Sequence, residues 1–362
     1  MFDSELEYLK YEPSESDIVI SRGKYLDQLE GFWLGQSIGN WTGLITEMDK
    51  VKPPFYTDKN WGRLDQKNIW GSYISPNDTI ITYNLVENND LWFSDDDTDI
   101  EYMYQHLLDI NNVSILNPSQ IREGWLKHIY SNESAPNGEN FLWVSNENAF
   151  YLMLNGLYPP QTSEPKNNPY YSMIDAQLTT EIFGLFAPVQ YKVALKMAHL
   201  PIRVTAKFDS EWVSRFYVKM HSLASDIDST LTIKQQINLM AMNARKELPN
   251  DSYSAKMYDF IEQSYLNNSD TSNWEKTRDE IYLRYQLNSN DGYIYKNPFD
   301  SGINFAASLI SLFYGAGDFK RTIQIGTLTG WDSDNPTATW GGLLGFLLGR
   351  KKIEELFRNR TL

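Results

Sequence analysis

The chain has 362 residues, of which 41% are hydrophobic and 22% charged, and its mean hydropathy is −0.48. This composition is typical of a water-soluble globular protein and excludes a disordered or fibrous chain. The formal net charge of −15 has the opposite sign to that needed for binding nucleic acid or an anionic membrane, so we expect neither as a partner.

Cysteine is absent, which excludes thiolate nucleophiles, disulfides and zinc-thiolate sites. Since no two of the four histidines have HExxH or HxH spacing, any bound metal should be held by oxygen ligands. The N-terminus is acidic and does not resemble a signal peptide, and no apolar stretch approaches the ~18 residues of a membrane span. We therefore expect a cytoplasmic protein.

Apolar residues recur at three- and four-residue spacing along most of the chain after residue 20, which predicts an all-helical fold. No linker divides the chain, so we expect one domain over residues 21–362 after an N-terminal extension over 1–20. Ser301 should cap a helix that ends at Gly315. The expected helices span 25–40, 78–88, 98–110, 118–130, 145–155, 189–199, 211–224, 232–246, 252–266, 272–287, 301–315, 318–328 and 334–349. Two long segments, 45–76 and 157–171, should be irregular, and loops of this length are often functional.

Glycine recurs every four residues in two predicted helices, although glycine costs a helix interior about 1 kcal/mol relative to alanine. Small residues at this spacing let helix backbones approach closely, so we expect these helices to be central and packed together. The alternative is two unrelated buried helices. The first carries Gly31, Gly35, Gly39 and Gly43, and the second carries Ala338, Gly341 or Gly342, Gly345 and Gly349.

Acidic residues stand beside the ends of these helices and at one further predicted helix start. Asp332 and Asp334 precede the second glycine helix, and Asp78 follows a proline turn. Each could simply cap a helix. If they converge, however, their repulsion would favour a divalent cation, and oxygen ligands without cysteine or paired histidine indicate Mg²⁺ or Mn²⁺.

Several of these segments resemble motifs of the ADP-ribosylglycohydrolase family. GFWLGQSIGNWTGLITE (31–47) is similar to the family's GxxxGxAxGDAxGxxxE, SPNDT (75–79) to its DDT motif, and GWDSDNPTATWGGLLG (330–345) to GGDTDxxAATxG. Residues 157–188 are similar to a PPxNPYxGAQIRADxFGxxAP stretch of one bacterial branch. The order and spacing of the motifs run from residue 25 to 350.

The resemblance implies an orthogonal helical bundle with two Mg²⁺ or Mn²⁺ ions, which hydrolyses the bond between ADP-ribose and a protein or small-molecule acceptor. Position by position, it implies metal ligands at Asn77, Asp78, Asp332, Asp334 and Asn335. It implies catalytic roles for Glu47, Asp78 and Asp332, with Glu47 or a metal carboxylate as the base. Substrate contacts are expected from Trp331, Asn335 and Gln177.

The sequence also departs from the family pattern, which indicates an altered cleft. Asn77 and Asn40 replace aspartates, and Pro76 stands where a ligand threonine is often found. Asp175 replaces a glycine, Thr179 replaces a basic residue, and TAKFDS (205–210) replaces an SHxxNG segment. A second hypothesis is therefore a weak or inactive family member that binds a nucleotide, ADP-ribose or a partner protein.

Two other features of the sequence bear on function. GQSIG (35–39) matches the GxSxG pattern of serine hydrolases, but no β-strand pattern precedes it and the segment is typical of a glycine-rich helix. The chain is rich in aromatic residues, and most, such as Trp33 and Trp340, should belong to the core. Trp61, Trp70 and Tyr73 lie in the long loop 45–76, where they could form a flap over the site or pin the loop down.

Overall fold

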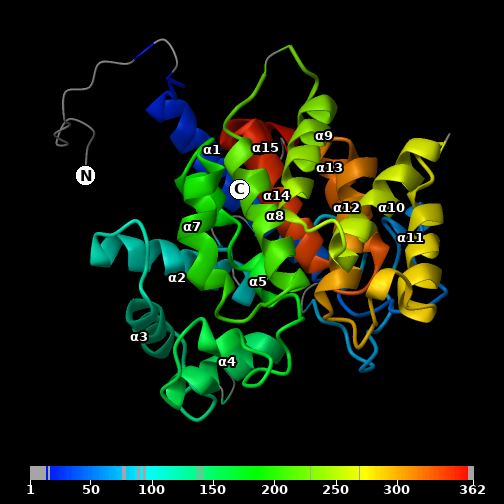
Figure 1. Cartoon of the computed structure of the whole chain (residues 1–362). Helices are drawn as coiled ribbons and strands as arrows, with labels where there is room; N and C mark the ends of the chain where they lie inside the picture. The colour runs from blue at the N-terminus through cyan, green and yellow to red at the C-terminus, as the bar shows by residue number, and fades with distance from the viewer. Residues whose placement is uncertain are drawn as a thin grey trace.

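The computed structural model describes residues 14, 17–75, 79–87, 90–92, 95–136, 138, 140, 142–228, 230–268 and 270–357, apart from the side chain of Asp97. Over these residues the fold is all-helical and forms one domain, as predicted, with extended pairing limited to two isolated bridges (Figure 1). None of the described helices has the length and apolar character needed to cross a membrane. The helices are α1 (Arg22–Gly43), α2 (Asp96–Asn111), α3 (Pro118–His128), α4 (Val144–Leu154), α5 (Asp175–Leu178), α6 (Ile182–Phe186), α7 (Tyr191–Ile202), α8 (Asp209–Leu223), α9 (Ile233–Ala244), α10 (Tyr253–Asn267), α11 (Trp274–Ile281), α12 (Ser301–Gly315), α13 (Phe319–Thr329), α14 (Asp334–Leu348) and α15 (Arg350–Leu356).

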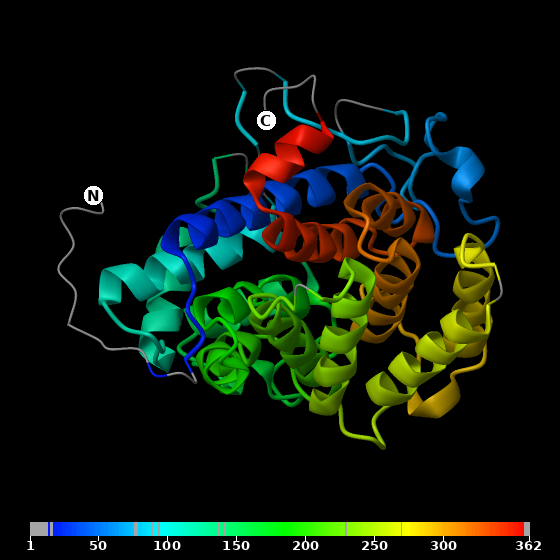
Figure 2. The same cartoon turned by 90° about the horizontal axis from the view of Figure 1, so that it is seen from above.

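The two glycine helices, α1 and α14, lie side by side through the middle of the molecule, which confirms their predicted packing (Figure 2). A Cβ atom added at Gly35 would lie 2.2 Å from the carbonyl oxygen of Gly341, and one at Gly345 would lie 2.1 Å from that of Gly31. Because these distances are below any van der Waals contact, only glycine permits this backbone approach. The pairing also runs the helices antiparallel, so the end of α1 meets the start of α14.

The other helices surround this pair. The α2–α4 hairpins lie at one end of the molecule and α10 and α11 at the opposite end (Figure 1). Between them α12 is buried along its whole length and packs on both α13 and α14. Its N-cap is Asp300 rather than the expected Ser301, and the left-handed residue that ends it is Ala316, one position after Gly315.

The helix expected over 78–88 is wrong for residues 79–87, which are not helical and pair with the preceding loop through the isolated bridge between Ile80 and Leu64. The amide of Ile81 donates to the carbonyl of Arg63 at 2.8 Å, and the amide of Gly62 donates to the carbonyl of Ile81 at 2.7 Å. A run of β-branched residues, Thr79 to Thr82, favours this pairing with the preceding loop. The sequence did not predict the short helices α5, α6 and α15. The helix expected over 272–287 is α-helical only as far as Ile281 and continues as a π-helix.

Candidate functional site

The turn after α1 and the turn before α14 are joined by backbone hydrogen bonds. The amide of Met48 donates to the carbonyl of Trp331, and the amide of Trp331 donates to the carbonyl of Lys50, both at 2.9 Å. Gly330 makes the crossing possible, since its φ is +107° and a Cβ there would lie 2.5 Å from the carbonyl oxygen of Lys50. This pairing brings Glu47 opposite the first turn of α14.

Three carboxyl groups meet at this crossing. Oxygen atoms of Glu47, Asp332 and Asp334 all lie within 4.8 Å of one another. Asp332 and Asp334 are buried, whereas Glu47 is half-buried. Burial, and then the charge of Asp334, raise the pKa of Glu47 and of Asp332 well above the ordinary carboxylate range.

The start of α2 adds a fourth carboxyl group, Asp96. Burial raises its pKa strongly, and the negative charges of Asp95, Asp175 and Asp334 raise it further. Its side chain accepts a hydrogen bond from Nδ2 of Asn146 at 3.2 Å. The neighbouring Asp95 accepts one from Nδ2 of Asn40 at 2.6 Å, so the asparagine that replaces a family aspartate holds a carboxylate of this cluster.

These residues suit a hard divalent cation. Among the described residues, no lysine, arginine or histidine forms an ion pair with Glu47, Asp96 or Asp332. The donor set consists of carboxylate oxygens, which Mg²⁺ and Mn²⁺ prefer. Close carboxylates with raised pKa values and no basic partner are the arrangement that a bound cation would stabilise.

A cavity of about 1510 Å³ opens from this cluster. Its walls come from the end of α1, the loop before residue 75, the exposed face of α2, and the segment between α3 and α4. Glu47, Asp95, Asp96 and Asp334 lie at one end, and aromatic side chains cover much of the remainder: Trp41, Trp70, Tyr73, Tyr102, His106, His128, Tyr130, Trp143 and Phe299.

The other residues predicted for the site lie in different places. Asn77 and Asp78 fall outside the described residues. Trp331 is fully buried, and its indole N–H donates to Oε1 of Gln286 at 2.7 Å. Asn335 and Gln177 are also buried, and Nδ2 of Asn335 and both amide atoms of Gln177 have no hydrogen-bond partner among the described residues. The cavity-lining residues that the structure describes include none of these three.

The aromatic residues of loop 45–76 were expected either to cover the site or to pin the loop down, and the structure shows both arrangements. Trp70 and Tyr73 line the cavity and are 56% and 42% exposed. Trp61 instead packs edge to face on Tyr83, with ring centroids 4.9 Å apart, and so pins the loop down. Ser37 of the GxSxG match lies inside α1 and donates to the carbonyl of Trp33, as expected of a helical residue and not of a nucleophile elbow.

The fold is all-helical, and carboxyl groups cluster where the two antiparallel glycine helices meet. Both features agree with the helical bundle and acidic metal site that the sequence motifs imply. The sequence pattern of the family described as ADP-ribosylglycohydrolase matches residues 21–361, and the chain belongs to this family. A solved structure described as an "ADP-ribosylglycohydrolase-related protein complex" is similar, with 13% sequence identity, 94% of each chain covered and a TM-score of 0.54. At this identity the likeness shows the fold alone. The curated proteins include no match to the chain.

Sequence reasoning missed Asp96. The letters Asp-Asp-Thr occur literally at 96–98, where α2 begins, and this copy of the family's DDT motif could have identified the residue. SPNDT also resembles the motif, but the helix expected after it is absent over residues 79–87.

Proposed function

We propose that the protein is a metal-dependent hydrolase that cleaves the bond at the anomeric carbon of a ribosyl group. The family implies that this group is ADP-ribose on a protein or small-molecule acceptor. The observation that carries the proposal is the convergence of Glu47, Asp332 and Asp334 within 4.8 Å, beside a cavity large enough for a nucleotide-sized ligand.

We assign the metal site to Asp96, Asp332 and Asp334, with Asn335, Asn77 and Asp78 as further proposed ligands. A pair of Mg²⁺ or Mn²⁺ ions bound there would supply a polarised water and orient the ribose hydroxyl groups. Asp332 is held in place through its amide, which donates to Oδ1 of Asn304 at 3.2 Å. Asn335 is buried in the first turn of α14, next to Asp334, and would offer its amide oxygen as a ligand.

Glu47 is the proposed acid and base. It follows the rigid helix α1, lines the cavity, and is the most exposed of the three converging carboxyl groups. Because its pKa is raised by burial and by Asp334, it can hold a proton at a pH where an ordinary glutamate is ionised. It can therefore take a proton from a water in the cavity and return one to the leaving group.

The experiment is an assay of ADP-ribosylated arginine and serine peptides, ADP-ribose derivatives and simple ribosides with Mg²⁺ or Mn²⁺. We expect Glu47→Gln and Asp332→Ala to lower turnover by roughly 10²–10⁴-fold, the usual loss on removing a positioned acid or base. Asp109→Asn, an exposed acidic residue near the end of α2, is the matched control and should retain activity. Turnover that survives both site substitutions would refute the assignment.

A second candidate is binding without catalysis. It is favoured by Asn40, which stands where the family has an aspartate and reduces the negative charge available to a second metal. Metal content separates the two candidates: two bound divalent ions and turnover support the hydrolase, whereas one ion or none and no turnover of any substrate support the binding protein.

A further inference from the structure

Within the proposed function, on which this inference rests, we propose that the cavity selects ribosides that carry no phosphate and have an aromatic or cationic group on the anomeric carbon. The described lining of the cavity is acidic. Among the described residues that line the cavity there is no lysine and no arginine, whereas Glu47, Asp95, Asp96, Asp99 and Asp334 contribute carboxyl groups. The short undescribed stretches between residues 75 and 142 contain no lysine or arginine either. A diphosphate in this cavity would find no described lysine or arginine to bind it, and the only imidazoles among the described lining residues are those of His106 and His128.

Helix N-termini are the usual anion sites where basic side chains are missing, but here acidic side chains take those positions. The amide of Asn146, in the first turn of α4, donates to Oδ1 of Asp175 at 2.9 Å, and the Ser145 hydroxyl donates to Oδ2 of the same carboxyl group at 2.5 Å. The first turns of α2 and α14 contain Asp96 and Asp334. The starts of α2, α4 and α14 therefore place negatively charged carboxyl groups where an incoming phosphate would bind.

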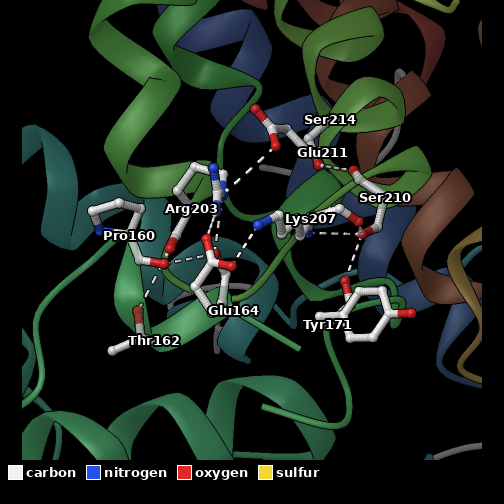
Figure 3. Close-up of polar contacts among 10 residues, drawn as sticks. Pro160, Thr162, Glu164, Tyr171, Arg203, Lys207, Ser210, Glu211 and Ser214 are labelled. Carbon is white, nitrogen blue, oxygen red and sulfur yellow. Dashed lines mark hydrogen bonds and ion pairs between the residues drawn. The ribbon is translucent and has the colours of Figure 1, made fainter. Parts of the chain in front are cut away.

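The two basic residues of segment 203–207 form ion pairs with glutamates outside the cavity lining. Figure 3 shows Arg203 and Lys207 both directed at Glu164 of the long loop. Nη2 of Arg203 donates to Glu164 at 2.8 Å, its Nε lies 3.6 Å from Glu211, and Nζ of Lys207 donates to the other oxygen of Glu164. These ion pairs fasten the long loop to the start of α8 and leave both positive charges neutralised.

Exposed aromatic rings line the cavity. Trp70, Tyr102, Tyr130 and Trp143 are 56%, 62%, 60% and 52% exposed, although such large rings are usually buried. All four line this one cavity. Exposed rings stack on planar bases and attract cations through their π-faces, and neither interaction uses phosphate.

Nicotinamide riboside, whose pyridinium ring is both aromatic and cationic, is therefore a suitable probe. In its hydrolysis the bond between C1 of ribose and the ring nitrogen breaks, and the electron pair leaves with neutral nicotinamide. The water oxygen bonds to C1, and one water proton is released by way of Glu47. No oxidant or further reactant is needed.

The test compares substrates that share this scissile bond and differ only in phosphate: nicotinamide riboside, its 5′-mononucleotide, and the adenine dinucleotide. With free Mn²⁺ held constant, we expect kcat/KM for the riboside to exceed that of both phosphorylated substrates by at least about tenfold, equivalent to about 1.4 kcal/mol. Equal or faster turnover of either phosphorylated substrate would overturn the inference.

If no substrate is turned over, the proposed hydrolase function fails for this bond. The preference for substrates without phosphate is then tested separately, by calorimetric measurement of binding. Tighter binding of the riboside than of the mononucleotide supports it, and the reverse order or no binding overturns it. Tyr102→Lys should raise the relative kcat/KM, or affinity, of the mononucleotide, because it places a cation in the cavity. Ile110→Lys, an exposed position two turns further along α2 and outside the cavity, should not change the preference.

Discussion

In Glu47, Asp96 and Asp332 the negative charges of neighbouring carboxyl groups add to burial, which is the larger cause of the raised pKa values. Asp334, Asp95 and Asp96 all raise the pKa of Glu47, and Asp334 and Glu47 both raise that of Asp332. A folded protein that holds these groups together without a cation is under electrostatic strain, which it relieves either by binding protons or by binding metal. Protons and metal therefore compete for the same oxygens.

This competition predicts how stability depends on pH. Because Glu47, Asp96 and Asp332 have raised pKa values in the folded state, they retain protons that the unfolded chain has already lost above pH ~4. The unfolding free energy of the metal-free protein should therefore fall as pH rises from about 5 to 8.

Thermal denaturation across this pH range, in EDTA and in excess Mg²⁺, measures the effect. Glu101, whose pKa is raised by burial to about 8, changes stability in the same direction but lies outside the cluster, so the difference between the two conditions isolates the metal site. Asp332→Asn should reduce that difference. A melting temperature that is independent of pH in EDTA would contradict the prediction.

The second prediction concerns Asp96. Asp96→Asn should abolish most of the stabilisation by Mg²⁺, which reaches about 2.7 kcal/mol when the metal is at one hundred times its Kd. Thermal shift against Mg²⁺ concentration is the measurement, with Asp109→Asn as the control on the same helix. Asp78→Asn belongs in the same series, because that residue remains a proposed ligand. Full stabilisation of Asp96→Asn by Mg²⁺ would remove Asp96 from the site.

At the scale of helices, the glycine stripes make a prediction about stability. Gly35→Ala and Gly345→Ala should each destabilise the protein by at least the ~1–3 kcal/mol typical of an overpacked core, because the new methyl group would meet backbone atoms that cannot turn away. Gly23→Ala, near the start of the same α1, is the matched control, since nothing lies within 4 Å of its added Cβ. There alanine should be neutral or slightly stabilising. Chemical denaturation measures all three.

The same glycines show what could be read from the sequence. A four-residue repeat of small residues favours close approach of two helices, so the central α1–α14 pair could be predicted from it. The assignment of Glu47 to the same site as Asp332 and Asp334 came instead from the resemblance to the family motifs. The non-helical segment 79–87 could not be predicted in this way, because the conformation of residues 79–81 depends on pairing with residues 62–65. Trp331 could not be placed either. Its sequence position beside the acidic pair is compatible with a cavity wall, but the pairing with Met48 and Lys50 turns its ring into the core.

For the molecule as a whole, the metal site joins segments that are far apart in sequence. Glu47 follows α1, Asp96 begins α2, and Asp334 begins α14, two residues after Asp332. The α2–α4 end of the molecule, which forms one wall of the cavity, packs mainly within itself and on α5 (Figure 1). The division of the chain at residue 20 stays a prediction, since α1 begins at Arg22 and little before it is described.

Metal binding should therefore stabilise the α2–α4 end more than the rest of the molecule. Without a cation, the charges of Asp95 and Asp334 oppose the approach of Asp96 to the cluster, whereas a cation shared by Asp96 and Asp334 would hold α2 to α14. Hydrogen exchange measured by mass spectrometry should slow in peptides from 96–111 and 144–154 when Mg²⁺ is added. Exchange in α10, which lies at the opposite end of the molecule from α2 (Figure 1), should be the same with and without metal. Asp332→Asn should weaken the protection of α2, and Asp109→Asn should not. Uniform protection of the whole chain by Mg²⁺ would mean that the metal does not act as a clamp between these two helices.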